Sequence, residues 1–244
     1  GVQQWASRFN GPANSNDYSK AVFIDASGNS FVTGNAVISG SSTDIYTVKY
    51  NSSGVQQWAA AFNGNGNDSD DANCITMDNL SNIIIGGKSK SASSDFDFVT
   101  VKYNSSGNQQ WAKYFTGTSL NSRDEIISIA SDLNNNILAG GNAKNLGSGY
   151  DYVTVKYNSS GDLLWNSNHG GTSGTDDLMS YLCIDPAGNA YVTGFTNDFL
   201  SGMNFCTVKY NINGTQDWEK KYNFIDNDSD KASMVKTDTS GNVY

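Results

Sequence analysis

Residues 150–165 read YDYVTVKYNSSGDLLW, and this stretch decides the fold. In its first half, Thr154 and Lys156 alternate with tyrosines and valines, close to the period of two that a β-strand requires. The tetrapeptide NSSG at 158–161 then supplies residues typical of a tight turn. The stretch therefore predicts two antiparallel strands joined by a hairpin, and helical periodicity is not convincing anywhere in the chain.

The same stretch recurs along the whole sequence. Successive tryptophans are 53, 53, 54 and 53 residues apart, and successive Lys-Tyr pairs are 53, 54 and 53 residues apart. Two independent markers with one period indicate a tandem repeat of about 53 residues. The one extra residue falls within TGTSLNSRD, residues 116–124, and is predicted to be a loop insertion. The markers are Trp5, Trp58, Trp111, Trp165 and Trp218, and Lys49, Lys102, Lys156 and Lys209.

Each repeat contains four short segments with strand character. In the third repeat they are EIISIASD, NILAGGN, YDYVTVKY and, after the turn, DLLWNSN. Tandem units of four strands are typical of a β-propeller, in which each unit supplies one blade. We therefore expect an all-β propeller with at least four complete blades and parts of others.

We interpret residues 1–244 as a single propeller domain. By analogy with other propellers, the first strand of each blade is innermost and the tryptophan strand is outermost. The chain then opens with an outermost strand, GVQQWASRF, and stops within the second strand of a fifth blade, so we expect the natural protein to continue at both ends. The repeats are 1–53, 54–106, 107–160 and 161–213, with a partial repeat at 214–244.

The turns between the first two strands share an aspartate and a glycine. They read DASGN at 25–29, DPAGN at 185–189 and DTSGN at 238–242. Asp can accept backbone N–H groups across a tight turn, and Gly supplies the positive φ that closes it. Asn135 and Ser81 take the glycine place in two repeats, and Ser is the less comfortable of the two.

Two further acidic positions recur. One immediately precedes the first strand of every blade, and the other precedes the third strand. A carboxylate that every blade carries is expected to hold a loop rather than to catalyse. The first series is Asp17, Asp70, Asp124, Asp177 and Asp230, and the second is Asp44, Asp97 and Asp151, with Asn204 in the fourth repeat.

These repeated motifs resemble the SBBP family of bacterial β-propeller repeats. The closest pieces are YLCIDPAGNAYVTGF, DYVTVKYNSSGDLLW and DIYTVKYNSSGVQQW, and the resemblance covers essentially the whole chain. It implies an exported or surface protein of bacteria, often large and multidomain, whose repeats act as a scaffold. It supplies no catalytic residues.

One face of the disc is the better candidate for binding. The turns DxxGN and NSSG share one face and follow a consensus, whereas the links after the second strand and before the first vary and share the other. Binding residues tend to lie on loops held by a rigid scaffold. The alternative is that these are surface loops whose sequences vary without a binding role and whose apolar side chains pack within the loops. The candidate binding residues are the apolar Phe195, Phe199, Leu200 and Met203 and the basic Lys88, Lys90 and Lys144.

Composition excludes several functions. The net charge of −9 and the pI near 4.4 disfavour nucleic acid, and the sequence has no apolar run of membrane-spanning length. Nucleotide-binding glycine motifs are absent. We therefore expect no nucleic-acid partner and no membrane insertion.

Metal sites receive little support from the sequence. Cys74, Cys183 and Cys206 occupy unrelated places in the repeat, which predicts free, buried thiols, and His169 is the single histidine. Two acidic loops offer the oxygen ligands that calcium prefers, NGNGNDSDD at 63–71 and the alternate aspartates of the fifth repeat. Lys231 and Thr237 stand where an EF-type loop needs Gly and Glu, so solvated acidic loops are the preferred interpretation and no cofactor is predicted. The alternate aspartates are Asp226, Asp228 and Asp230.

The sequence leaves three hypotheses for function. The first is a non-enzymatic extracellular or cell-surface scaffold that binds a protein or polysaccharide through the variable-link face. The second is a propeller that binds or cleaves carbohydrate with aromatic and acidic side chains. The third is a subunit of a surface assembly that pairs through open blade edges, with another chain or with a second copy of itself.

Overall fold

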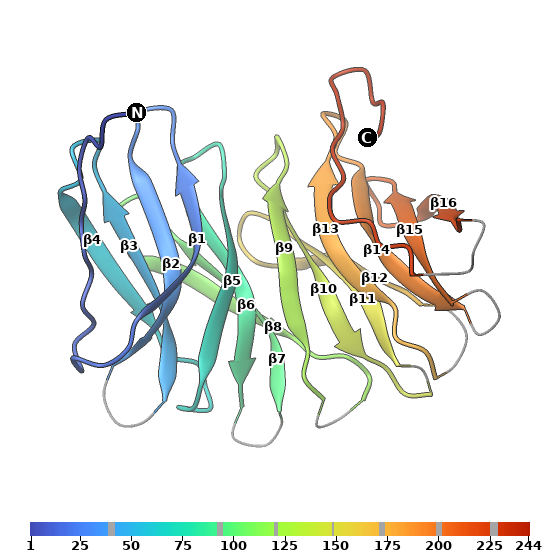
Figure 1. Cartoon of the computed structure of the whole chain (residues 1–244), viewed down its shortest axis with the longest axis horizontal. Coiled ribbons are helices and arrows are strands. Elements are labelled where there is room, and N and C mark those ends of the chain that lie inside the picture. The colour runs from blue at the N-terminus through green and yellow to red at the C-terminus, as the bar shows by residue number, and fades with distance from the viewer. Residues whose placement is uncertain are drawn as a thin grey trace.

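The computed structural model describes residues 1–38, 42–91, 95–119, 122–147, 149–170, 174–198, 202–224 and 229–244. These residues form sixteen β-strands and no helix. None of the described segments is therefore a long apolar helix that could cross a membrane. The strands make four antiparallel sheets of four strands, which we number blades 1 to 4 in chain order (Figure 1). The all-β propeller architecture predicted from the repeat is confirmed.

Within each blade, the order of the strands in the sheet is their order in the sequence. The outermost strand of a blade nevertheless lies in the next sequence repeat, since β4 falls within 54–106 but pairs with β3. The blades are β1 (Tyr18–Ile24), β2 (Ser30–Val37), β3 (Thr43–Tyr50) and β4 (Gln56–Phe62); β5 (Asp70–Met77), β6 (Ile83–Lys90), β7 (Phe96–Tyr103) and β8 (Gln109–Phe115); β9 (Glu125–Ser131), β10 (Ile137–Lys144), β11 (Tyr150–Tyr157) and β12 (Leu163–His169); and β13 (Leu178–Ile184), β14 (Ala190–Asp198), β15 (Gly202–Tyr210) and β16 (Gln216–Tyr222).

The four blades stand side by side in a row that is open in Figure 1, with blade 1 at one end and blade 4 at the other. The first strands β1, β5, β9 and β13 contact one another in sequence, which makes them the innermost strands, as expected. The tight turns lie at one end of the strands and the links at the other, because all pairings are antiparallel. The one-residue insertion lies in the link between β8 and β9, as predicted.

The second strand of each blade contains a glycine that allows the first two strands of the blade to approach closely. A Cβ atom on Gly34 would lie 1.9 Å from the carbonyl oxygen of Tyr18, and one on Gly87 would lie 1.9 Å from that of Asp71. The strand register shifts beside this contact. No larger residue fits there, which explains why glycine recurs at this place in the repeat.

The tryptophan of each outer strand packs against the following blade. The Trp58 ring lies 6.5 Å from that of Tyr103, and its indole N–H donates to the Ser105 carbonyl at 3.1 Å. The ring also covers Gly107, where a Cβ would come within 2.7 Å of it. The same contact joins Trp111 to Gly161 and Trp165 to Gly214. The hydrophobic core is thus made between blades rather than within one.

The turn chemistry is as predicted. Asp25 Oδ1 accepts the backbone N–H groups of Ser27 and Asn29 at 2.9 and 2.8 Å, and Gly28 has a φ of +78°. Ser81 and Asn135 adopt the same left-handed conformation, with φ of +61° and +62°. In blades 2 and 3 the turn aspartate also binds the buried lysine of the third strand, at 2.8 Å for Lys102–Asp78 and 3.1 Å for Lys156–Asp132.

The two ends of the chain depart from the expected strands. Residues 1–10 form no strand, although Trp5 stacks on Tyr50 and covers Gly54 as the other tryptophans do. Near the other end, residues 229–244 form only an isolated bridge between Thr237 and Val243. A strand needs hydrogen-bonding neighbours on its edges, and no described strand of this chain supplies a full set for either segment. Both segments keep the packing of a blade without its full ladder.

Candidate functional site

The predicted binding residues Lys88 and Phe195 lie at the same place in two blades and point to the next blade. The Lys88 ammonium contacts Glu125 of blade 3 at 2.8 Å and Asp71 of its own blade at 3.6 Å, and only 4% of the residue is exposed. Phe195 is 7% exposed, and the Lys231 ammonium lies 4.7 Å from its ring centre. Lys88 therefore bridges blades 2 and 3, and Phe195 contacts the segment that follows blade 4, so neither side chain stands free on the link face.

The other predicted residues are spread over the link face. The Lys90 ammonium is partly exposed and pairs with Asp68 at 2.9 Å, while Lys144 is exposed at the end of β10. Met203 is half-buried in β15, opposite Asn197. Phe199 and Leu200 lie outside the described residues. Among the described members of the predicted set, Lys144 is therefore exposed and Lys90 and Met203 are partly exposed.

The acidic residue before each first strand holds the link that leads to it. Asp70 Oδ2 accepts the Gly64 N–H at 2.6 Å, and Asp124 Oδ2 accepts the Gly117 N–H at 2.7 Å. Asp17 and Asp230 make the same bond to residues six positions earlier. The interpretation of this series as structural agrees with these contacts.

The second acidic series lies buried beside the first. Asp44 is 1% exposed and Asp70 is fully buried. Burial, with a smaller contribution from the charge of Asp70, raises the pKa of Asp44 to about 6. A carboxyl of this pKa resembles a general acid, but the fold closes it from solvent. Burial, with a smaller contribution from the charge of Asp97, likewise raises the pKa of Asp124. The same pairing of acids is therefore repeated in the next interface.

In the two acidic loops considered as calcium sites, the described carboxylates bind nearby groups of the protein. In the loop at 63–71, Asp68 pairs with Lys90 and Asp70 holds Gly64. In the later loop, Asp226 and Asp228 lie outside the described residues, and Asp230 accepts the Phe224 N–H at 2.7 Å.

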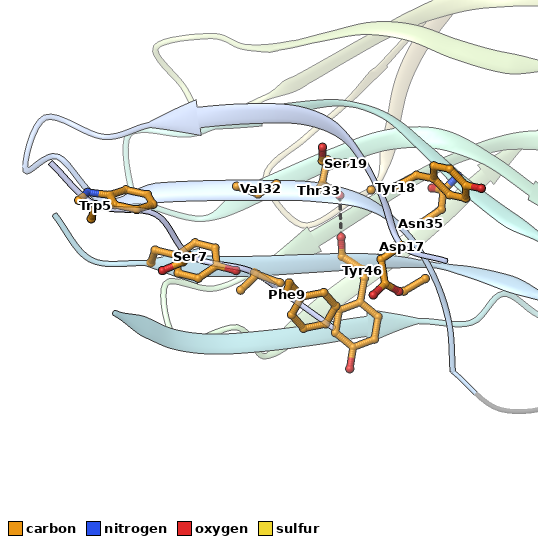
Figure 2. A pocket seen from close by; sticks show the side chains of 14 residues that line it. Trp5, Ser7, Phe9, Asp17, Tyr18, Ser19, Val32, Thr33, Asn35 and Tyr46 are labelled. Atoms are coloured by element: carbon orange, nitrogen blue, oxygen red, sulfur yellow. Dashed lines mark hydrogen bonds between the residues drawn. The ribbon is translucent and has the colours of Figure 1, made fainter. Parts of the chain in front are cut away.

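A pocket of about 320 Å³ lies between the N-terminal segment and blade 1. Figure 2 shows Trp5, Ser7 and Phe9 following one another along this segment, beside Val32 of β2 and Tyr46 of β3. The Phe9 and Tyr46 rings lie 4.8 Å apart. Aromatic walls and a carboxylate, Asp17, also line it, which is a composition found in sugar-binding sites.

The pocket residues are, however, those that join blades elsewhere. Trp5, Phe9 and Tyr50 occupy the repeat positions of Trp58, Phe62 and Tyr103, which form the core between blades 1 and 2. On the same end of blade 1, Val22 is 61% exposed, whereas at this repeat position Ile75 is half-buried and Ile129, Leu182 and Val235 are 9%, 2% and 2% exposed. The pocket therefore lies on a blade-docking face that lacks a full partner blade.

A separate cluster joins blades 3 and 4. His169 ends β12, and its Nε2 lies 3.7 Å from Cys206 Sγ of β15 and 3.8 Å from Glu219 Oε2 of β16. Cys206 Sγ lies 3.8 Å from Glu219 Oε1, and Lys221 Nζ is 3.4 Å from the same oxygen. Among the described residues, this is the one group of three or more potential metal-ligating side chains.

The cluster is largely shielded from water. Burial lowers the pKa of His169, against the opposing charge of Glu219, and raises the pKa of Cys206 to about 12. The side chains of His169 and Glu219 are 10% and 28% exposed. All three cysteines are free thiols, as the sequence predicts; Cys183 and Cys206 are buried, whereas Cys74 is only half-buried. The sequence gives no reason to bring Cys206 and His169 together. A comparison of equivalent repeat positions would have marked the cluster, because Phe stands at the His169 position in three of the other repeats.

Comparison with known proteins defines the fold. No family model and no curated protein matches the chain. A solved protein of unknown function from Dyadobacter fermentans superposes with a TM-score of 0.57 and 9% identity, covering 84% of this chain and 69% of that one. A second, from Bacteroides caccae and also of unknown function, has a TM-score of 0.48 and 14% identity, covering 84% and 68%. A calcium-binding protein, regucalcin, from Agrobacterium tumefaciens has a TM-score of 0.41 and 12% identity, covering 82% and 73%. At these identities the likeness concerns the fold.

Proposed function

We propose that the chain is a non-enzymatic repeat scaffold of the extracellular or cell-surface kind, which holds a protein or polysaccharide on its link face. One observation supports this most strongly. The carboxylates that recur in each blade bind the backbone of that blade, as Asp70 and Asp124 do at Gly64 and Gly117. The repeated polar chemistry therefore serves the fold and leaves the variable links for recognition.

The buried acid pair argues against cleavage of a sugar. A glycoside hydrolase needs two carboxyl groups on either side of a bond in its substrate. Asp44 and Asp70 are at most 1% exposed, so a substrate cannot reach them without opening the interface between blades 1 and 2. The same pairing recurs in the next interface, which is expected of a structural feature.

The test uses isolated cell-envelope fragments of the source organism as the probe. The purified chain should co-sediment with them and release no reducing sugar. The charge reversals K90E/K144E on the link face should weaken co-sedimentation several-fold, while K20E on β1, an exposed strand of blade 1, should leave it unchanged. Sugar release would make the protein an enzyme, and failure to co-sediment would contradict an adhesive role.

Self-association is a second candidate, favoured by the open face of blade 1. Consecutive blades pack against one another in the order of the sequence. Figure 1 places blades 1 and 4 at opposite ends of the row, and each has one side that no other described blade covers. Val22, Ile24 and Tyr18 expose apolar surface at the blade 1 end. A second copy can therefore dock head to tail, which is a heterologous contact.

Sedimentation velocity over a range of concentrations tests this assembly. The wild-type chain should form species larger than a monomer as concentration rises, and V22K should shift them back to monomer. The matched control is L133K, because Leu133 is 70% exposed but lies in a turn away from the blade 1 face. A wild-type chain that stays monomeric at all concentrations rejects the assembly and leaves the scaffold proposal standing.

A further inference from the structure

The cluster of His169, Cys206 and Glu219 has the composition of a zinc site. Zinc binds imidazole nitrogen, thiolate sulfur and carboxylate oxygen, and many sites combine three protein ligands with one open position. Hard cations such as calcium and magnesium prefer oxygen ligands alone, and a thiolate selects against them. The three side chains come from three strands of two blades.

The distances suit a tetrahedral ion. Zinc bonds of about 2.0–2.3 Å at tetrahedral angles place the donor atoms about 3.4–3.6 Å apart. Cys206 Sγ lies 3.7 Å from His169 Nε2 and 3.8 Å from Glu219 Oε1, whereas His169 Nε2 lies 3.8 Å from the other carboxylate oxygen, Oε2. One donor atom from each of the three residues lies within 4.8 Å of the other two. A single ion would therefore draw the three side chains together by up to about 1 Å, with Glu219 turning one of its oxygens toward both His169 and Cys206.

The other interfaces show that packing does not require these residues. Between blades 1 and 2, the same three repeat positions hold Phe62, Val99 and Ala112, which belong to one apolar cluster. Between blades 2 and 3 they hold Phe115, Val153 and Asn166. Three potential ligands therefore replace the Phe, the Val and the small residue at one interface only.

The replacement would be unfavourable without a ligand. Polar groups withdrawn from water lose hydration, and Cys206 Sγ offers only weak sulfur hydrogen bonds in return, at 3.7 Å to His169 Nε2 and 3.8 Å to Glu219 Oε1. Cys206 is fully buried, and the Tyr152 ring covers His169 with a centroid distance of 5.7 Å. A metal ion would replace these weak contacts with direct bonds to nitrogen, sulfur and oxygen.

We infer that His169, Cys206 and Glu219 bind one zinc ion that clamps blade 3 to blade 4. Glu219 is the most exposed of the three side chains, so the ion enters from its side and keeps its open position there. Lys221, which pairs with Glu219, opposes the ion by charge repulsion.

The test is calorimetric titration of metal-free protein with Zn²⁺, paired with the absorption spectrum of the Co²⁺ form. One equivalent should bind and raise the melting temperature, and Co²⁺ should show a thiolate charge-transfer band. The variant H169F/C206V/E219A carries the residues of the interface between blades 1 and 2, so it should fold and lose both signals. K221M should bind more tightly than the wild type.

The control is C183A, which removes the other buried thiol of blade 4 and should bind zinc as the wild type does. Binding that survives in H169F/C206V/E219A, or that is lost in C183A with the fold intact, would overturn the site. So would a wild-type chain that binds no zinc and gives no cobalt band.

Discussion

The interface between blades 1 and 2 and the interface between blades 3 and 4 have the same backbone arrangement. They differ in the side chains that the third and fourth strands contribute. In the first, Phe62 packs with Val99 and Ala112 in an apolar cluster. In the second, the same positions bring together His169, Cys206 and Glu219. Because the strands and registers are equivalent, the difference lies in the side chains alone.

The shared part of both interfaces lies around the tryptophans. Trp58 covers Gly107, and Trp165 covers Gly214. A Cβ atom added to these glycines would lie 2.7 and 2.5 Å from the indole rings. Each indole donates to a carbonyl of the next blade, at 3.1 and 3.0 Å. The comparison teaches that the repeat fixes the docking of blades near the turns and allows chemistry to vary toward the links.

Truncating the aromatic positions should give the largest difference between the two interfaces. F62A removes a side chain that is 4% exposed, and should lower the free energy of unfolding by about 3–5 kcal/mol. H169A in metal-free buffer should cost about 1 kcal/mol, because the imidazole is polar and its removal takes less apolar surface out of the interface. Urea titrations followed by tryptophan fluorescence measure both values.

Zinc provides the control for this pair. Adding zinc should stabilise the wild type and F62A by the same amount. It should leave the stability of H169A unchanged. Equal losses for F62A and H169A without metal would mean that His169 is a packing residue like Phe62, and the distinction between the interfaces would fail.

The fold could be predicted because its determinants are local and repeated. The turn aspartates and glycines need only neighbouring residues, as at Asp25 and Gly28, and the 53-residue period repeats them. The ends were less predictable, since residues 1–10 contain strand-like sequence but lack a described ladder partner. Strand formation depends on that neighbour as much as on the residues themselves.

The site could be predicted only in part, because it depends on contacts between blades. The sequence places Lys88 and Phe195 in variable links, but β6 and β14 continue past them, and their side chains contact Glu125 of blade 3 and Lys231 after blade 4. His169 and Cys206 are 37 residues apart and meet only when blade 4 docks on blade 3. No spacing rule within one strand or loop reveals such a pair.

Substituting the glycines under the tryptophans should give an intermediate effect that is equal at both interfaces. Gly107 and Gly214 have φ of +83° and +82°, and an added Cβ would also meet the indole ring. G107A and G214A should each lower the free energy of unfolding by about 2–3 kcal/mol. G241A, with φ of +81° and open space around it, should cost about 1 kcal/mol. Clearly unequal losses for G107A and G214A in thermal or urea unfolding would show that the two interfaces do not share a common docking contact.

The smallest effect concerns the buried acid of the first interface and has the opposite sign. The pKa of Asp44 is about 6 in the folded chain against an ordinary value of 3.8. The folded protein therefore holds more protons than the unfolded chain between these values, and the free energy of unfolding falls as pH rises from about 4 to about 6. Asn204 already stands at this position in blade 4. D44N should remove that pH dependence and stabilise the protein at pH above 6 by about 1–2 kcal/mol.

Urea titrations between about pH 4 and pH 8 measure this effect, with D25N as the matched control. Hydrogen bonds from Asn29 and Ser27 outweigh burial and lower the pKa of Asp25, so its carboxylate stabilises the fold above its ordinary pKa. D25N should therefore lose stability at neutral pH, where D44N gains it. A D44N variant less stable than the wild type at neutral pH would mean that the Asp44 carboxylate has a stabilising partner in the interface, and the acid pair would then join blades 1 and 2 rather than strain them.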